Sequence, residues 1–238
     1  RGGMGVNTAI IIQARMGSTR LPGKVLLSVR GKSLIQYLLV RVRAANLGLP
    51  IIVATSRDSS DDPIASFCDL QALDCYRGSC LDVASRFADV IDIYGLDAFV
   101  RLSGDSPLLD GSILRQAMGM MADSTDLVTN IYPRSYPRGQ SVEILRAECF
   151  RKAFPRMKKD SDREHVTSFF YRNAAEFKIQ NLLNAPSLPS TSMAVDTKED
   201  FDRFKRLIEA VGDAWIGMTY QQLLERMQKG VSQQDLLT

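Results

Sequence analysis

Three cations in a loop near the start of the chain have the most readily interpreted chemistry. A β-branched segment, TAIIIQ, leads into a loop that carries Arg15, Arg20 and Lys24. Gly17 and Gly23 lie in the same loop, and glycine lets backbone N–H groups approach a ligand closely. Guanidinium and ammonium groups donate charge-assisted hydrogen bonds to phosphate oxygens, and this loop has no acidic residue to neutralise them. The loop therefore suits a polyphosphate.

The spacing of the loop excludes two common phosphate-binding motifs. A Walker A loop has four residues between its first glycine and its Gly-Lys pair, whereas five residues separate Gly17 from Gly23. Val25 follows Lys24, where that motif requires Ser or Thr for a metal ion. The dinucleotide fingerprint needs three glycines in G-x-G-x-x-G spacing, and Pro22 and two cations interrupt that pattern here. We expect a nucleoside triphosphate bound in another geometry; the alternative is a solvated turn between a strand and a helix.

Two aspartates far along the chain are predicted to hold a metal ion beside this loop. Asp105 follows the apolar run 98–102 and Asp196 follows the apolar run 193–195. Each is therefore expected just past the end of a strand, where open α/β sheets place their chemistry. Two carboxylates joined to triphosphate oxygens by a hard divalent ion commonly hold Mg²⁺ in proteins. The alternative for Asp105, a turn or a helix cap, is better filled by Asp110, which directly precedes a predicted helix.

The charges are divided unequally along the chain. The first acidic residue is Asp58, so residues 1–57 carry nine Lys/Arg and no Asp/Glu in a protein whose net charge is +3. The rest of the chain is net negative, and this division predicts a positive site against an acidic body. The basic residues are not interleaved with aromatic ones, so we do not expect a nucleic-acid partner.

Alternating strand and helix patterns predict the α/β framework that positions these residues. Apolar β-branched runs predict strands at 9–12, 51–54, 73–76, 98–102 and 193–195, and helical periodicity predicts helices at 33–47, 61–70 and 81–94. Ser33 and Gln36 have the spacing of a capping box, which predicts where the first helix begins. The strand at 98–102 is apolar except for Arg101, as expected inside a mostly parallel sheet.

The segment 130–182 differs in character from the rest. It contains Pro133 and Pro137, a hairpin-like run at 142–145, and two predicted helices at 147–154 and 162–175. We expect this insertion-like segment to cover the acceptor site or to form a subunit contact.

Length and composition indicate an ordinary globular protein. The chain has 238 residues, 45% of them hydrophobic and 24% charged, which fits a single domain over 1–238. It has no run of about 18 apolar residues and no charged-then-apolar leader, so we expect neither a membrane span nor a secretory signal, and a cytoplasmic location. With one histidine and no C-x-x-C pair, a zinc cluster is not expected.

Several motifs together resemble one family. They are IIQARMGSTRLPGK from Ile11, RGS from Arg77, RLSGDSPLLD from Arg101, YPRG from Tyr136, REHVT from Arg163 and VDTKED from Val195. The sequence resembles the cytidylyltransferases that activate acidic sugars, the acylneuraminate and 3-deoxy-manno-octulosonate enzymes, and most of all their spore-coat polysaccharide (SpsF-type) homologues. The matching motifs span residues 8–202, the great majority of the chain.

The resemblance implies a fold, a reaction and a set of site residues. The fold would be a three-layer α/β/α sandwich of the nucleotide-diphospho-sugar-transferase type, commonly dimeric. The reaction would transfer CMP from CTP to a sugar-acid hydroxyl with release of pyrophosphate. The catalytic residues would be Arg15, Lys24 and Asp105, and Asp105 and Asp196 would bind Mg²⁺. The nucleotide would bind at Gln13, Ala14, Arg15, Gly17, Ser18, Arg20, Lys24, Arg77 and Ser79. The acceptor would bind at Tyr136, Arg138, Gln140, Glu143, Arg163 and His165, with His165 as open to a structural role as to a binding one.

One departure and two alternatives bear on function. SpsF-type sequences usually read Gly-Leu-Asp-Val-Glu where this chain has Ser141 in place of the Asp, which bears on the acceptor. A glycosyltransferase on the same fold typically has a D-x-D pair, but Ser106 and Pro107 follow Asp105 here. Another nucleotidyltransferase, or a catalytically silent partner that binds nucleotide or sugar without turnover, are the remaining alternatives.

Overall fold

The computed structural model describes residues 7–234, with side chains described through residue 229. Within these residues seven strands form one sheet in the order β5-β4-β1-β6-β8-β7-β9. The strands are β1 (Thr8–Gln13), β4 (Ile51–Ser56), β5 (Asp74–Gly78), β6 (Ala98–Ser103), β7 (Leu127–Thr129), β8 (Glu143–Arg146) and β9 (Ile179–Asn181). Strand β8 runs antiparallel to β6 and β7, and the other neighbouring pairs are parallel. A small hairpin, β2 (Ser28–Val29) and β3 (Lys32–Ser33), lies apart from this sheet.

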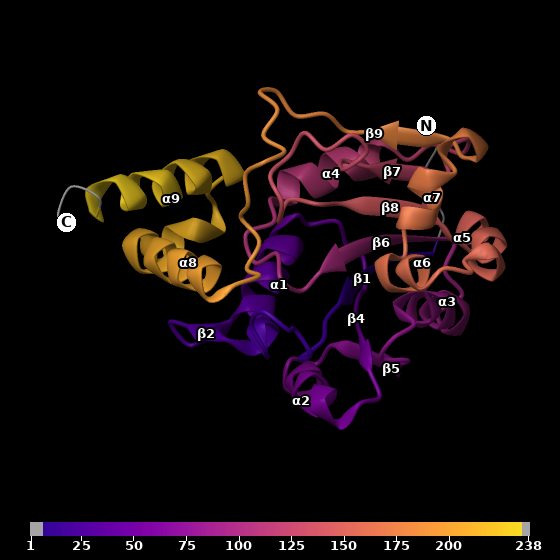
Figure 1. Ribbon diagram of the computed structural model, residues 1–238, viewed down its shortest axis with the longest axis horizontal. Helices are drawn as coiled ribbons and strands as arrows, with labels where there is room; N and C mark the ends of the chain where they lie inside the picture. Colours follow the sequence, from indigo (N-terminus) through magenta and orange to yellow (C-terminus); the bar gives the residue numbers. More distant parts are fainter. Residues whose placement is uncertain (1–6, 235–238) are drawn as a thin grey trace.

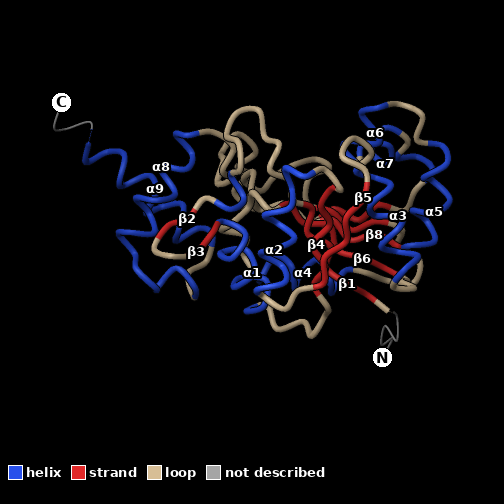
Figure 2. Tube along the Cα trace, turned by 90° about the horizontal axis from the view of Figure 1, so that it is seen from below, coloured by secondary structure: helices blue, strands red, loops and turns tan. Residues whose placement is uncertain are grey.

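Helices cover both faces of the sheet (Figures 1 and 2). One face packs against α1 (Leu34–Ala44), α2 (Asp62–Leu70) and α4 (Gly111–Met120). Helices α8 (Lys198–Val211) and α9 (Tyr220–Gln234) pack against each other to one side of the sheet and extend this core beyond α1. The other face packs against α3 (Val83–Ile93), α5 (Ala147–Ala153) and α7 (Ser168–Arg172), and α6 (Asp160–His165) packs on α3. Short 3₁₀ turns lie at Lys24–Leu26, Ser59–Asp61, Phe154–Arg156, Ala174–Glu176 and Gly212–Ile216.

Strand β1 shows how the sequence builds the three layers. Ile10 and Ile12 are buried on the α1 side, while Ala9 and Ile11 are buried on the α3 side, because successive side chains of a strand point to opposite faces. A strand covered on both faces therefore reads as a continuous apolar run. The predicted α/β architecture with a mostly parallel sheet is confirmed. No helix between residues 7 and 234 has the length and apolar character needed to cross a bilayer.

Most predicted elements are present, with small changes at their ends. The helix predicted at 33–47 is α1, which ends at Ala44, and its capping box of Ser33 and Gln36 is formed. The helix predicted at 162–175 is instead divided into α6 and α7 at Val166, whose φ of 58° cannot continue a helix.

The run predicted as hairpin-like at 142–145 is the interior strand β8, which pairs antiparallel with β7, the preceding strand in the chain, and also with β6. One predicted element is wrong. The run at 193–195 bends at Ala194 and forms no strand, because its N–H groups bond to two different loops. Met193 N–H donates to the Arg138 carbonyl (2.8 Å) and Val195 N–H donates to the Asp105 carbonyl (3.0 Å). Segment 130–182 contributes β8, β9, α5, α6 and α7 to the main body of the protein.

Candidate functional site

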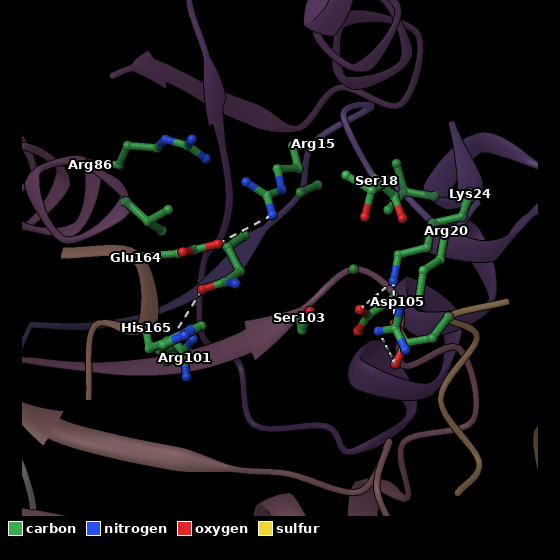
Figure 3. Close-up of a pocket in the computed structure, with 17 residues that line it drawn as sticks. Arg15, Ser18, Arg20, Lys24, Arg86, Arg101, Ser103, Asp105, Glu164 and His165 are labelled. Atoms are coloured by element: carbon green, nitrogen blue, oxygen red, sulfur yellow. Dashed lines mark hydrogen bonds and ion pairs between the residues drawn. The ribbon is translucent and has the colours of Figure 1, made fainter. Parts of the chain in front are cut away.

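A cavity of about 250 Å³ lies where β1 and β6 end (Figure 3). Its wall is formed by Gln13, Ala14, Arg15, Ser18, Thr19, Arg20, Lys24, Val25, Val83, Arg86, Arg101, Ser103, Gly104, Asp105, Glu164, His165 and Asp196. Figure 3 shows two groups of charged side chains with Ser103 between them. The Lys24 end consists of Arg20, Lys24, Asp105 and Asp196. The Arg101 end consists of Gln13, Arg15, Arg101, Glu164 and His165.

At the Lys24 end, one ammonium group joins two carboxylates. Lys24 Nζ lies 2.7 Å from Asp105 Oδ2 and 2.6 Å from Asp196 Oδ1. Arg20 Nη2 lies 3.3 Å from the other oxygen of Asp196. The Lys24 side chain is 11% exposed, so its ammonium group is largely withdrawn from water, whereas Arg20 remains exposed. Two of the three loop cations, Arg20 and Lys24, therefore meet the two distant aspartates as predicted, whereas Arg15 pairs with Glu164 at the other end of the cavity.

Short backbone contacts bring these residues together. Asp105 directly follows the Ser103-Gly104 end of β6, and its carbonyl accepts the hydrogen bond from Val195, which holds Asp196 alongside. The next residue, Thr197, caps α8 and accepts a hydrogen bond from the Asp200 N–H. Asp200 in turn accepts from the Asp196 N–H (3.0 Å), so the backbone at Asp196 is satisfied and its carboxylate is left to face Lys24.

The charges at this end act on the pKa of Asp196. Partial burial raises the pKa of Asp196, but the hydrogen bond and charge of Lys24, together with the charge of Arg20, more than offset it. The net result is a pKa below the usual aspartate value, so Asp196 is ionised at neutral pH. An ionised carboxylate is the form that binds a divalent cation.

At the Arg101 end, α6 brings an acid and a histidine to the cavity. Glu164 Oε1 lies 3.6 Å from Arg15 Nη2, so α6 reaches back to the first loop. The next residue, His165, also lines the cavity. The chain then turns at buried Val166 through a γ-turn, in which the Thr167 N–H donates to the His165 carbonyl (2.5 Å). A β-branched residue with positive φ is strained, and such residues persist where surrounding packing fixes them.

Behind this end, a buried polar chain runs across the sheet. Arg101 on β6 is paired in register with Glu143 on β8, and its guanidinium forms an ion pair with that carboxylate. The Glu143 side chain is 2% exposed, and the Tyr171 hydroxyl donates to its other oxygen. Burial and the neighbouring Glu143 raise the pKa of Tyr171, which stays protonated as a donor. Thr129 hydrogen-bonds the same hydroxyl (2.9 Å), so the Glu143 carboxylate is fully held within the protein.

The structure brings together part of the predicted set. The cavity wall includes Gln13, Ala14, Arg15, Ser18, Arg20, Lys24, Asp105, His165 and Asp196. Within the described part of the chain, the wall does not include Gly17, Arg77, Ser79, Tyr136, Arg138, Gln140, Glu143 or Arg163.

Other partners account for several of the residues outside the wall. Arg77 forms an ion pair with Asp62 (2.6 Å) and donates to two backbone carbonyls. Arg163 donates to Asp82 (3.0 Å) and lies over the Phe154 ring.

Of the remaining residues outside the wall, Gly17, Ser79 and Arg138 are exposed, whereas Tyr136, Gln140 and Glu143 are buried. Gln140 is fully buried, where its amide bonds to the Asp110 N–H and the Leu108 carbonyl, 2.8 Å each. Tyr136 is 5% exposed and packs on Tyr220.

Sequence reasoning missed three charged residues of the cavity wall. Glu164 lay inside a matched motif but was passed over. Arg101 was noted as the single charge in an apolar strand, which is the signal that could have found it, because a charge in a buried strand needs a partner or a ligand. Arg86 is 1% exposed, and its guanidinium donates to the Ser79 and Cys80 carbonyls. Arg86 lies in the helix α3, where a charged residue is ordinary, so its place in the sequence did not single it out.

Comparisons with known proteins identify the family. The cytidylyltransferase family model matches residues 9–229. The spore coat polysaccharide biosynthesis protein SpsF of Bacillus subtilis is 33% identical over 212 residues, which cover 85% of this chain and 87% of that protein. A 3-deoxy-manno-octulosonate cytidylyltransferase of Vesicomyosocius okutanii is 28% identical over 179 residues, 74% of this chain and 70% of that one. The solved structure of a cytidylyltransferase from Leptospira borgpetersenii superposes with a TM-score of 0.89 at 28% identity, covering 95% of this chain and 96% of the other. This chain therefore belongs to the cytidylyltransferase family, as its motifs predicted.

Proposed function

We propose that this protein transfers CMP from CTP to an acidic keto-sugar of the nonulosonate or 3-deoxy-octulosonate type, releasing pyrophosphate, in surface polysaccharide biosynthesis. The observation that carries the proposal is the Lys24 end of the cavity, where loop cations meet Asp105 and Asp196. Membership in the cytidylyltransferase family supports CTP as the nucleotide. The names of the relatives, a spore coat polysaccharide protein and octulosonate cytidylyltransferases, support the sugar and its destination.

The residues at this end fit a magnesium ion. Asp105 and Asp196 would hold it, because their carboxylates converge on one point, now marked by Lys24 Nζ at 2.7 and 2.6 Å. Residues 7–234 contain no group of three or more His, Cys, Asp or Glu able to hold a metal. Two carboxylates completed by water and phosphate oxygens are what Mg²⁺ prefers. Bound there, Mg²⁺ would neutralise phosphate charge and make the α-phosphorus more electrophilic.

The chain's own residues would do the rest by positioning. Attack on the α-phosphorus needs an aligned hydroxyl, neutralised charge and an in-line leaving group rather than covalent help. Lys24 would exchange its two carboxylates for phosphate oxygens and, with Arg15 and Arg20, stabilise the departing pyrophosphate. Gln13 and Ala14 would face the nucleoside.

Within segment 130–182, α6 would supply the acceptor side of the cavity. Glu164 and His165 lie in the cavity wall, which supports this assignment. Exposed Arg138 would contribute from outside that wall, whereas Tyr136, Gln140 and Glu143, also implied by the resemblance, are buried and would support the site without touching the acceptor.

Pyrophosphate release tests the proposal. With Mg²⁺ and CTP, we expect release only when a suitable 3-deoxy-2-keto sugar acid is added, and little release with UTP, ATP or GTP. Preferential saturation by another triphosphate would overturn the nucleotide assignment. Thermal-shift titrations of the four triphosphates, with and without Mg²⁺, separate an enzyme from a silent partner. A melting temperature that rises equally with and without Mg²⁺, or that does not rise, would favour the silent partner.

We also infer a homodimer that works in the cytoplasm, where CTP is available. Tyr132 and Leu183 are 42% and 64% exposed, and hydrogen bonds between Asn181 and residues 132 and 133 join the segments that carry them. An apolar pair of this kind suits a subunit contact. Light scattering that gives the mass of two chains would agree, and a single-chain mass at micromolar concentration would not.

A further inference from the structure

The side-chain amide of Gln13 is held in one orientation by its neighbour. Arg101 Nε lies 3.1 Å from Gln13 Oε1. A guanidinium carries only donors, so the amide must turn its oxygen, not its nitrogen, toward Arg101. In an unrestrained glutamine, by contrast, either end of the amide can face a ligand.

The remaining half of the amide is available to a ligand. Gln13 lines the cavity, and in the described part of the chain its Nε2 has no hydrogen-bond partner. Because the oxygen is engaged by Arg101, the group that Gln13 can offer across the cavity is an N–H donor. A ligand atom placed there must accept a hydrogen bond.

The orientation of Arg101 is itself fixed from behind. Its Nη1 is paired with Glu143 and lies 3.4 Å from Thr167 Oγ1, while Tyr171 occupies the second oxygen of Glu143. These contacts come from β8, the start of α7 and α7 itself, so Arg101 cannot swing away without breaking a buried ion pair. Glu143 and Tyr171, which lie outside the cavity wall, can therefore act on the ligand only through Arg101 and Gln13.

We infer that Gln13 is a specificity-determining residue that offers an N–H donor to an acceptor atom of the ligand, and that Arg101, Glu143 and Tyr171 are the positioning residues that fix this choice. The inference rests on the proposed function. The acceptor atom has two possible sources, a ring carbonyl of the pyrimidine or an oxygen of the sugar acid. Ligands that present only donors at this point are disfavoured, since they would face a second donor.

Two nearly isosteric variants test the donor itself. Gln13→Glu keeps an oxygen for Arg101 but loses the N–H donor, and Gln13→Met loses both polar atoms. Calorimetry with CTP and Mg²⁺ is one arm, and calorimetry with 3-deoxy-manno-octulosonate is the other. We expect both variants to weaken binding by about 10- to 100-fold in one arm, because the acceptor atom of that ligand loses its hydrogen-bond donor. The affected arm shows whether the acceptor atom belongs to CTP or to the sugar acid. Unchanged affinity in both arms overturns the inference, whereas a wild-type protein that binds no CTP contradicts the proposed function instead.

A double-mutant cycle tests the positioning chain. Tyr171→Phe removes one hydrogen bond from Glu143 and should weaken the same arm by about 2- to 10-fold in the wild-type background. In the Gln13→Met background it should have no further effect, because no amide remains to be oriented. Tyr76→Phe is the matched control, since it removes a tyrosine–carboxylate hydrogen bond to Asp89 outside the cavity wall. The positioning role would be contradicted if Tyr171→Phe weakened ligand affinity as much in the Gln13→Met background as in the wild type. It would also be contradicted if Tyr171→Phe and the control Tyr76→Phe weakened affinity equally.

Discussion

The two ends of the cavity both contain paired charges, but they differ in what a ligand can do to them. At the Lys24 end, the side chains of Lys24, Asp105 and Asp196 are 11%, 24% and 28% exposed, so an incoming ion or phosphate can replace their mutual contacts. Behind the Arg101 end, Glu143 is 2% exposed and both of its oxygens are occupied by protein groups. The first arrangement is suited to rearrange during a reaction. The second is suited to hold a shape.

The largest expected effect is on turnover at the Lys24 end. Asp105→Asn should lower kcat by about 100- to 1,000-fold, because one of the two carboxylates proposed to hold Mg²⁺ loses its negative charge. The unfolding free energy should change little, since Lys24 keeps its contact with Asp196. Pyrophosphate release and urea unfolding measure the two effects. If the variant unfolds instead, the role of Asp105 is structural and the contrast between the two ends fails.

The opposite pattern is expected behind the Arg101 end. Glu143→Ala should lower the unfolding free energy by about 3–5 kcal/mol, because it leaves the Arg101 guanidinium without its buried carboxylate. Urea unfolding measures this loss. The control is Glu148→Ala, which removes an exposed partner of Lys152 and should leave stability nearly unchanged. Equal effects of the two substitutions would show that burial does not distinguish this ion pair.

Lys24→Met sharpens the comparison, because it should change two affinities in opposite directions. Without the ammonium, Asp105 and Asp196 are left facing each other unpaired, and Mg²⁺ should bind the nucleotide-free protein about tenfold more tightly. CTP should bind about tenfold or more weakly, because a charge-assisted contact to its phosphates is lost. Calorimetric titrations measure both. A parallel loss of both affinities would mean that Lys24 only supports the local fold.

The smallest expected effect is the pH dependence of the ion pair at the start of α6. The hydrogen bond from Arg172 lowers the pKa of Asp162, against the opposing effect of burial. A lowered folded-state pKa stabilises the protein above the unfolded value of about 3.9, and this contribution is lost as pH falls through the folded value. The stability difference between wild type and Asp162→Asn should therefore be full above about pH 4 and should close below it. Urea unfolding between pH 3 and pH 7 measures it, and a constant difference would contradict the assigned cause.

The sequence was most informative where function lies in contiguous residues. The loop of Arg15 to Lys24 and the position of Asp105 after an apolar run were both predictable, because spacing and strand ends are local features. Asp196 was found although its predicted strand is absent. Its place is set by a backbone hydrogen bond to the Asp105 carbonyl, which no local pattern reveals.

The Arg101 end could not be predicted in the same way. Gln13, Arg101 and Glu143 come from β1, β6 and β8, and their contact depends on the order of strands in the sheet. The resemblance named Gln13 and Glu143 for different roles and did not connect them. The turn at Val166 was equally hidden, because β-branched residues rarely adopt positive φ and only surrounding packing can impose it.

A crystal structure of the protein with CTP and Mn²⁺, the latter located by its anomalous signal, tests the central claim most directly. The account predicts the metal between Asp105 and Asp196, with Lys24 moved from those carboxylates onto phosphate oxygens. A metal bound elsewhere, or a triphosphate bound away from Lys24 while its ion pairs remain closed, would contradict it.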